Sequence, residues 1–286
     1  MRKSKFSDNQ GKCCDAVLRI LEDREGNTRS LPLDFPEKVQ HKAPVELTCK
    51  IGSTLYAIEH TKVEAYPEQM QDGSNFSDAL EHLEKSLAKV LPKHALFMLV
   101  VPANSFKGLK AKAVKDISAR IEKWVIGTAP LLKQSDHQME TITGTIDGVA
   151  FRVTLQAIFG IPDENGKLKI SRYPPADLEV LRAAHIKQML EKKLPKLEAW
   201  ALDGAHTVLV LESEDIALTN HSLVLEALKL SMQFQTFCPD YIFFVYAVGS
   251  PWIVQTLVSE KQFPEIPYQW YSYQEFESSK LVDLLA

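Results

Sequence analysis

The stretch that decides the fold is VELTCKIGSTLYAIEHTKV, residues 45–63. In VELTCKI, apolar and polar residues alternate, as they do in a strand with one buried face. The dipeptide Gly52-Ser53 is typical of a two-residue hairpin turn, and TLYAIEHTKV continues as the returning strand. The stretch therefore predicts a β-hairpin.

The predicted hairpin places two glutamates opposite each other. With a two-residue turn Ile51 pairs with Thr54, and the same register pairs Glu46 with Glu59. Directly opposed residues share a face, with their Cβ atoms about 4.5–5.5 Å apart, and two like charges there destabilise the ladder. Glu59 also lies in an otherwise apolar strand, where a carboxylate is costly without a partner.

A divalent cation is the expected partner of this acidic pair. Mg²⁺ is commonly held by one or two carboxylates and water, and such an ion can activate water and stabilise charge on a phosphate. The alternative is that Glu46 and Glu59 face solvent, splayed apart or neutralised by Lys50 or another cation. Thr61 shares the face of Glu59, whereas His60 and Lys62 alternate to the other face unless a bulge reorients them.

The remaining sequence predicts an α/β fold, in which a mixed central sheet is flanked by helices. A stretch rich in proline, glycine and charge, residues 160–175, is expected to be a linker or insertion that does not separate two cores, so residues 1–286 are expected to form a single domain. The expected helices are 9–26, 77–91, 113–125, 177–202 and 221–234, and the expected strands beyond the first hairpin are 95–101, a second hairpin over 141–159, 207–211 and 241–248.

Composition and charge exclude several classes. The chain has 286 residues, of which 45% are hydrophobic, as in globular proteins. A net charge of −4 excludes a polybasic chain that coats nucleic acid, although it is compatible with a local basic groove. The most apolar stretch, residues 241–258, is interrupted by Gly249 and Pro251 and is expected to be a strand, a turn and a helix rather than a membrane span.

Cysteine usage and the N-terminus indicate a location. The four cysteines show no CxxC or Cys/His ligand spacing, and no apolar targeting segment follows Met1. We therefore expect a cytoplasmic protein with reduced cysteines and no membrane association.

A hairpin with an acid on its first strand, and an acid near a lysine on its second, is similar to the core of the PD-(D/E)XK nuclease superfamily, which has the restriction-endonuclease-like fold. That core runs helix, hairpin, helix, strand, as residues 9–26, 45–63, 77–91 and 95–101 do here. The text VELTCKIGSTLYAIEHTKVEAY also resembles a group of uncharacterised bacterial proteins with an IEHT stretch. The resemblance covers about the first 100 residues. It implies a core over about 9–125, with additional strands and helices over about 139–286.

The resemblance implies roles for individual residues. Glu46 matches the first metal-binding acid and Glu59 the acid of the (D/E)XK element, so both are expected to bind Mg²⁺ or Mn²⁺. The lysine that would orient or activate the attacking water falls at Thr61, and Lys62 comes one residue late. Either Lys62 reaches in through a bulge, or Lys50 substitutes, or the site is inactive. The candidate catalytic residues are Glu46, Glu59, Thr61 and Lys62.

The function implied is hydrolysis of a phosphodiester by a metal-activated water, with DNA or RNA as the candidate partner. One alternative is a non-catalytic binding module on the same scaffold. Another is a subunit of a defence or toxin-type system that acts only with a protein partner.

Three further features have both a functional and a structural interpretation. The lysines of the loop at 106–115 could contact phosphates or lie on a solvated loop; they are Lys107, Lys110, Lys112 and Lys115. The acids after a buried strand, Glu212, Glu214 and Asp215, could form a rival metal site or a solvated turn. On the first helix, Asp15 and Glu22 could supply a further carboxylate or be helix surface charge.

Overall fold

The computed structural model describes residues 9–36, 44–134, 138–215, 221–264 and 273–285. The chain divides into two compact units, one made of Met1–Pro67 and Asp177–Ala286 and the other of Glu68–Ala176. The second unit is thus inserted into the first. This differs from the expected single domain with a continuous core over about 9–125, because the first unit is completed only by residues after 176.

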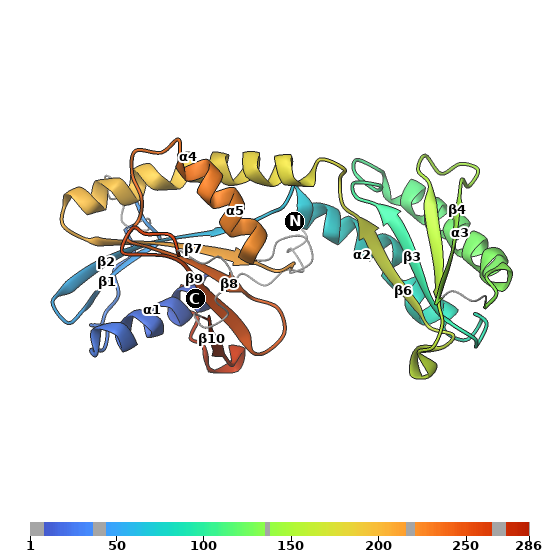
Figure 1. The fold of residues 1–286 in the computed structure, drawn as a ribbon, viewed down its shortest axis with the longest axis horizontal. Helices are drawn as coiled ribbons and strands as arrows, with labels where there is room; N and C mark the ends of the chain where they lie inside the picture. Colours follow the sequence, from blue (N-terminus) through green and yellow to red (C-terminus); the bar gives the residue numbers. More distant parts are fainter. Residues whose placement is uncertain (1–8, 37–43, 135–137, 216–220, 265–272, 286) are drawn as a thin grey trace. The chain divides into compact units, whose positions relative to one another are not determined.

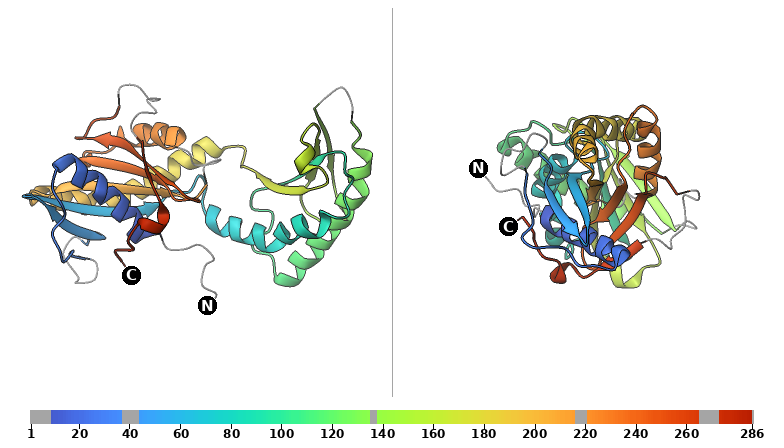
Figure 2. Two further views of the ribbon diagram at one scale, coloured as in Figure 1. Left: turned by 90° about the horizontal axis from the view of Figure 1, so that it is seen from below. Right: turned by 90° about the vertical axis from the view of Figure 1, so that its left-hand side faces the viewer.

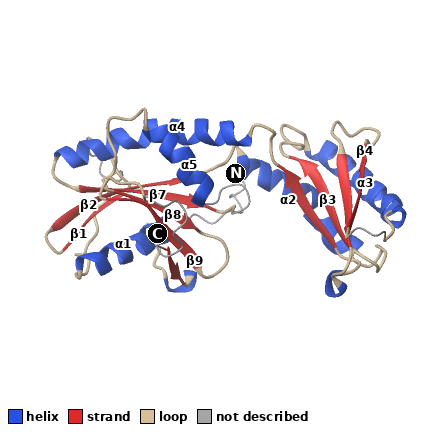
Figure 3. Ribbon diagram, viewed as in Figure 1, coloured by secondary structure: helices blue, strands red, loops and turns tan. Residues whose placement is uncertain are grey.

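The first unit is built on a six-stranded mixed sheet with the order β1-β2-β7-β8-β9-β10 (Figures 1 and 3). Its central strands β2, β7 and β8 run parallel, and the other neighbours are antiparallel. The expected α/β class with a mixed sheet is confirmed. The bounds are β1 Leu47–Ile51, β2 Thr54–Lys62, β7 His206–Ser213, β8 Tyr241–Tyr246, β9 Trp252–Ser259 and β10 Tyr273–Phe276.

Helices cover both faces of this sheet. Helix α1 (Gln10–Glu25) lies on one face, and α4 (Leu178–Leu202) with α5 (His221–Met232) lies on the other, as the end-on view in Figure 2 shows. Along β2, Ile58 packs into the core under α1 and Ala57 into the core under α4 and α5. Because side chains alternate along a strand, this assignment decides which helix each residue from Glu59 to Lys62 faces.

The second unit has its own four-stranded sheet with the order β4-β5-β3-β6. Its apolar core contains buried side chains of both helices and of β3, β5 and β6. Its elements are α2 Gln69–Leu87, β3 Leu96–Pro102, α3 Ala111–Thr128, η1 Ala129–Leu131, β4 Met139–Gly144, β5 Val153–Ile158, η2 Pro162–Glu164 and β6 Leu168–Tyr173.

Both predicted hairpins are confirmed. Ile51 pairs with Thr54 across a turn in which Gly52 has a φ of 59°, and Thr143 pairs with Thr154 in the second hairpin. Helix α1 also matches its prediction, with Cys13 and Val17 on the buried face and Gly26 in the left-handed conformation at its end. Local patterns sufficed here because each of these elements is closed by its own turn or cap.

Other expectations were wrong. Residues 160–175 contain strand β6, which pairs with β3 and is no linker. The second half of 241–258 is strand β9, antiparallel to β8, and not a helix. Helix α2 begins at Gln69, eight residues before the expected start at Ser77. Strand β3 belongs to the second sheet, so it is not a neighbour of the first hairpin. Among the described residues, no helix is both long enough and apolar enough to span a membrane.

Candidate functional site

The predicted acidic pair lies on one face of the sheet. The β1–β2 ladder runs from Ile51–Thr54 to Leu47–Ile58, so Glu59 follows its last paired residue on β2 and Glu46 lies just before the first residue of β1. Both carboxylates contact the same ammonium group. Lys193 Nζ lies 2.5 Å from Glu59 Oε2 and 3.4 Å from Glu46 Oε1. Glu59 is fully buried and the Glu46 side chain is 12% exposed, so the two acids do not splay into solvent.

Two lysines of α4 compensate the buried charge. Lys193 and Lys196 are three residues apart, which places them on the same side of the helix. Lys196 Nζ lies 2.8 Å from Glu59 Oε1, so each oxygen of this carboxylate faces an ammonium group. A buried ionised carboxylate is tolerated only when it is paired. The lysines therefore explain how Glu59 can occupy an otherwise apolar strand.

The lysines considered from sequence do not join this cluster. Lys62 points to the opposite face of β2, where its Nζ lies 3.0 Å from Glu214 and 3.7 Å from Glu212. No bulge interrupts the regular pairing of β2 with β7, so the expected alternation holds. Lys50 is exposed, and the Thr61 hydroxyl donates to the backbone carbonyl of Lys62 at 3.4 Å. The cation at the acidic pair thus comes from a helix and not from the hairpin.

Lys193 and Lys196 were missed because nothing local marks them. They lie in LEKKLPKLEAW, where lysines at helical spacing are typical of a solvated helix face. Only the packing of α4 on β2, more than a hundred residues away in sequence, turns them into partners of Glu59. The one signal in the sequence was Glu59 itself, because a glutamate in an otherwise apolar strand requires a cation from elsewhere in the chain.

A second polar cluster lies on the opposite face of β2, under α1. His60 Nε2 is 2.8 Å from Glu212 Oε2, and both side chains are buried. Asn9 donates to Glu212 at 3.4 Å and to Glu214 at 3.5 Å. Of the three acids predicted as a rival metal site after the buried strand, Glu212 and Glu214 therefore lie together in this cluster. Asp215 instead donates its backbone N–H to the Ser213 hydroxyl.

The pKa values of the two acids of this second cluster are shifted in opposite directions. Burial alone would raise the pKa of Glu212, but the hydrogen bond and charge of His60, together with Lys62, lower it overall. Burial raises the pKa of Glu214, and the hydrogen bond from Lys62 offsets this only in part. Glu212 is therefore held as a carboxylate, while Glu214 takes up a proton more readily.

Asp15 and Glu22 have a structural role in α1. Arg29 binds both of them, with its guanidinium nitrogens 2.8 Å from Asp15 and 2.8 Å from Glu22. The hydrogen bond from Arg29 lowers the pKa of Glu22. Neither acid contributes to the Glu46–Glu59 pair. In the other unit, Lys107 of the lysine-rich loop pairs with Glu68 at 2.7 Å.

The donor chemistry of Glu46 and Glu59 fits a hard cation. Carboxylate oxygens are the ligands that Mg²⁺ and Mn²⁺ prefer. The pair already shares one positive charge, the ammonium of Lys193. An ion held by both carboxylates would compete with this ammonium for the same oxygens.

Comparison of the chain with protein-family models, with curated proteins and with solved structures found no match in any of the three. The assignment of a function therefore depends on the geometry of the two clusters.

Proposed function

We propose that Glu46, Glu59 and Lys193 form the catalytic site of a metal-dependent nuclease that hydrolyses phosphodiester bonds in DNA or RNA. The observation that carries this proposal is the single ammonium of Lys193 in contact with both acids. It supplies the lysine that the resemblance to the PD-(D/E)XK superfamily requires and that Thr61 cannot provide. The set of two acids and a lysine is thus complete, although the lysine comes from α4.

Each residue has a distinct role in this proposal. Glu46 and Glu59 would hold Mg²⁺ or Mn²⁺, which when bound lowers the pKa of water and stabilises charge on a phosphate. Lys193, with three N–H donors and a full charge, would hold the attacking water or a phosphate oxygen once it leaves the carboxylates. Lys196 remains on Glu59 and keeps the buried carboxylate paired.

The test is cleavage of single- and double-stranded DNA and RNA with Mg²⁺ and with Mn²⁺. We expect wild type to cleave at least one polymer, and Glu59→Gln and Lys193→Met to lose about 10²–10⁴-fold of the rate. Lys192→Met is the matched control, because Lys192 is exposed on the same helix. Equal rates for wild type and Glu59→Gln would reject the site.

A non-catalytic binding module is the second candidate, because both oxygens of Glu59 already face ammonium groups. Calorimetric titration with Mn²⁺ separates the two proposals. A catalytic site should bind Mn²⁺, and Lys193→Met should bind it more tightly because the competing cation is gone. A module that has lost the chemistry should bind no Mn²⁺ in either form.

A further inference from the structure

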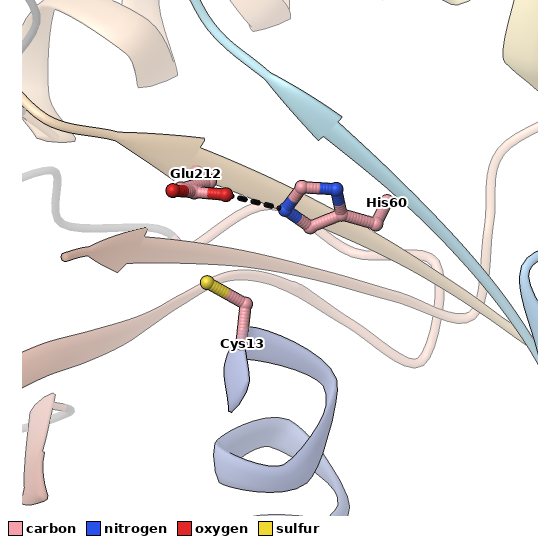
Figure 4. Close-up of side chains that lie close together, drawn as sticks. All are labelled: Cys13, His60 and Glu212. Carbon is pink, nitrogen blue, oxygen red and sulfur yellow. Dashed lines mark hydrogen bonds and ion pairs between the residues drawn. The ribbon is translucent and has the colours of Figure 1, made fainter. Parts of the chain in front are cut away.

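Three side chains with metal-binding atoms converge on the α1 face of the sheet. They are Cys13 from the first turns of α1, His60 near the end of β2 and Glu212 near the end of β7. One ligand atom of each, the cysteine sulfur, a ring nitrogen and a carboxylate oxygen, lies within 4.8 Å of the other two. Figure 4 shows the sulfur of Cys13 pointing toward the His60–Glu212 pair.

The cluster is enclosed by the protein. Cys13 and Glu212 are fully buried and His60 is 6% exposed. A cation held between the sulfur, the ring nitrogen and the carboxylate oxygen would use all three groups.

The donor set selects the kind of ion. Sulfur, imidazole nitrogen and carboxylate oxygen are the ligands of Zn²⁺, which binds them at about 2.0–2.3 Å in a tetrahedron, whereas Mg²⁺ and Ca²⁺ avoid sulfur. The three donors come from three different elements.

We propose that Cys13, His60 and Glu212 form a Zn²⁺ site that fastens α1 to the carboxyl ends of β2 and β7. Binding would replace the hydrogen bond between His60 Nε2 and Glu212 Oε2 with bonds from the ion to the sulfur, a ring nitrogen and a carboxylate oxygen; the neutral imidazole keeps its proton on the other nitrogen, and the thiol proton is released to solvent. The ion's two charges are met by the Cys13 thiolate and Glu212. Lys62, whose Nζ lies 3.7 Å from Glu212, opposes the ion, and Glu214 compensates Lys62 at 3.0 Å.

The site is distinct from the one proposed for catalysis. His60 and Glu59 are neighbours in sequence but face α1 and α4 respectively, so no ligand is shared. The Zn²⁺ site can therefore be tested independently of nuclease activity.

Co²⁺ is the probe, because a Co²⁺–thiolate bond gives a charge-transfer band in the near ultraviolet. All proteins carry Cys238→Ser, since Cys238 is the cysteine that is not buried. We expect the band in this background, its loss in Cys13→Ser, and its retention in Cys14→Ser and Glu59→Gln. Cys14 is the matched control, because it is equally buried and adjacent but lies outside the cluster. Zn²⁺ should displace Co²⁺ and raise the Tm.

The outcomes decide the assignment. Absence of a thiolate band in the background protein, or a band that persists in Cys13→Ser, overturns the proposal. If Cys13→Ser does not fold, His60→Gln gives the answer, because glutamine keeps a donor for Glu212 but is no zinc ligand. We expect it to weaken Co²⁺ binding by on the order of tenfold or more, and unchanged affinity would overturn the proposal.

Discussion

Replacement of Lys193 by methionine tests the electrostatics of the buried acidic pair. Glu59 is fully buried and the Lys193 side chain is 20% exposed, so the variant leaves one carboxylate oxygen without its ammonium. Removing one partner of a buried ion pair costs about 3–5 kcal/mol. Lys196 still contacts the other oxygen at 2.8 Å, so we expect a smaller loss, about 2–3 kcal/mol of the free energy of unfolding.

Urea denaturation followed by circular dichroism measures this loss as a lower midpoint with an unchanged slope. Lys192→Met, on the exposed side of the same helix, should change the free energy by no more than about 0.5 kcal/mol. In a double-mutant cycle, the variant carrying both Glu59→Gln and Lys193→Met should lose about 1 kcal/mol or more less than the sum of the two single losses, because Glu59→Gln removes the buried charge that Lys193 compensates. Equal losses of stability in Lys193→Met and Lys192→Met, or additive effects of the changes at Lys193 and Glu59, would refute the proposed pairing of Lys193 with Glu59.

Two further predictions concern the hairpin and α1. Gly52→Ala should destabilise the protein by about 1 kcal/mol in thermal unfolding, because Gly52 has a φ of 59° and an added Cβ would lie 3.2 Å from the Asn27 side chain. A Tm equal to that of wild type would contradict this. Arg29→Gln should cost about 1–3 kcal/mol at pH 7, since Arg29 lowers the pKa of Glu22. A lowered carboxyl pKa stabilises the folded state above its ordinary value of about 4.3, and this is lost as the pH falls through the lowered pKa. The difference between wild type and Arg29→Gln should therefore shrink below pH 4, and a difference independent of pH would be inconsistent with the assignment.

The sequence predicted those parts of the fold that are closed locally. Gly52-Ser53 set the register of the first hairpin, which the structure confirms from Ile51–Thr54 to Leu47–Ile58, and that register predicted that Glu46 and Glu59 lie on one face. The neighbour of β2 on its other side could not be predicted in the same way. Strand β7 pairs with β2 in parallel, and the whole of the second unit lies between them in sequence. A continuous apolar strand such as β3 carries no mark of the sheet to which it belongs.

The same distinction between local pairing and long-range packing separates the site residues that could be predicted from those that could not. The acids of the hairpin could be predicted because strand pairing fixes which side chains share a face. Lys193 could not, because a lysine on a helix gives no sign of what the helix packs against. Glu212 was predicted as part of a rival metal site with Glu214 and Asp215, but Cys13 and His60 were not joined to it, because ligand spacing in sequence identifies metal sites only when neighbouring residues supply the ligands. Here one ligand comes from each of three elements, and His60 and Glu212 are 152 residues apart.

The alternation of β2 has a chemical consequence when the two proposed sites are considered together. One residue step along the strand separates Glu59, which faces α4, from His60, which faces α1. On the first side the donors are carboxylate oxygens, and on the second they are sulfur, nitrogen and oxygen. Metal ions should therefore sort by their ligand preference, with Mn²⁺ at Glu59 and Zn²⁺ at Cys13. The sheet between them keeps the two sets apart, because the β2–β7 ladder fixes the face of every residue from Tyr56 to Lys62. Loss of Glu59 should then abolish Mn²⁺ binding and leave the thiolate band of Co²⁺ unchanged. Loss of Cys13 should abolish the thiolate band and leave Mn²⁺ binding unchanged.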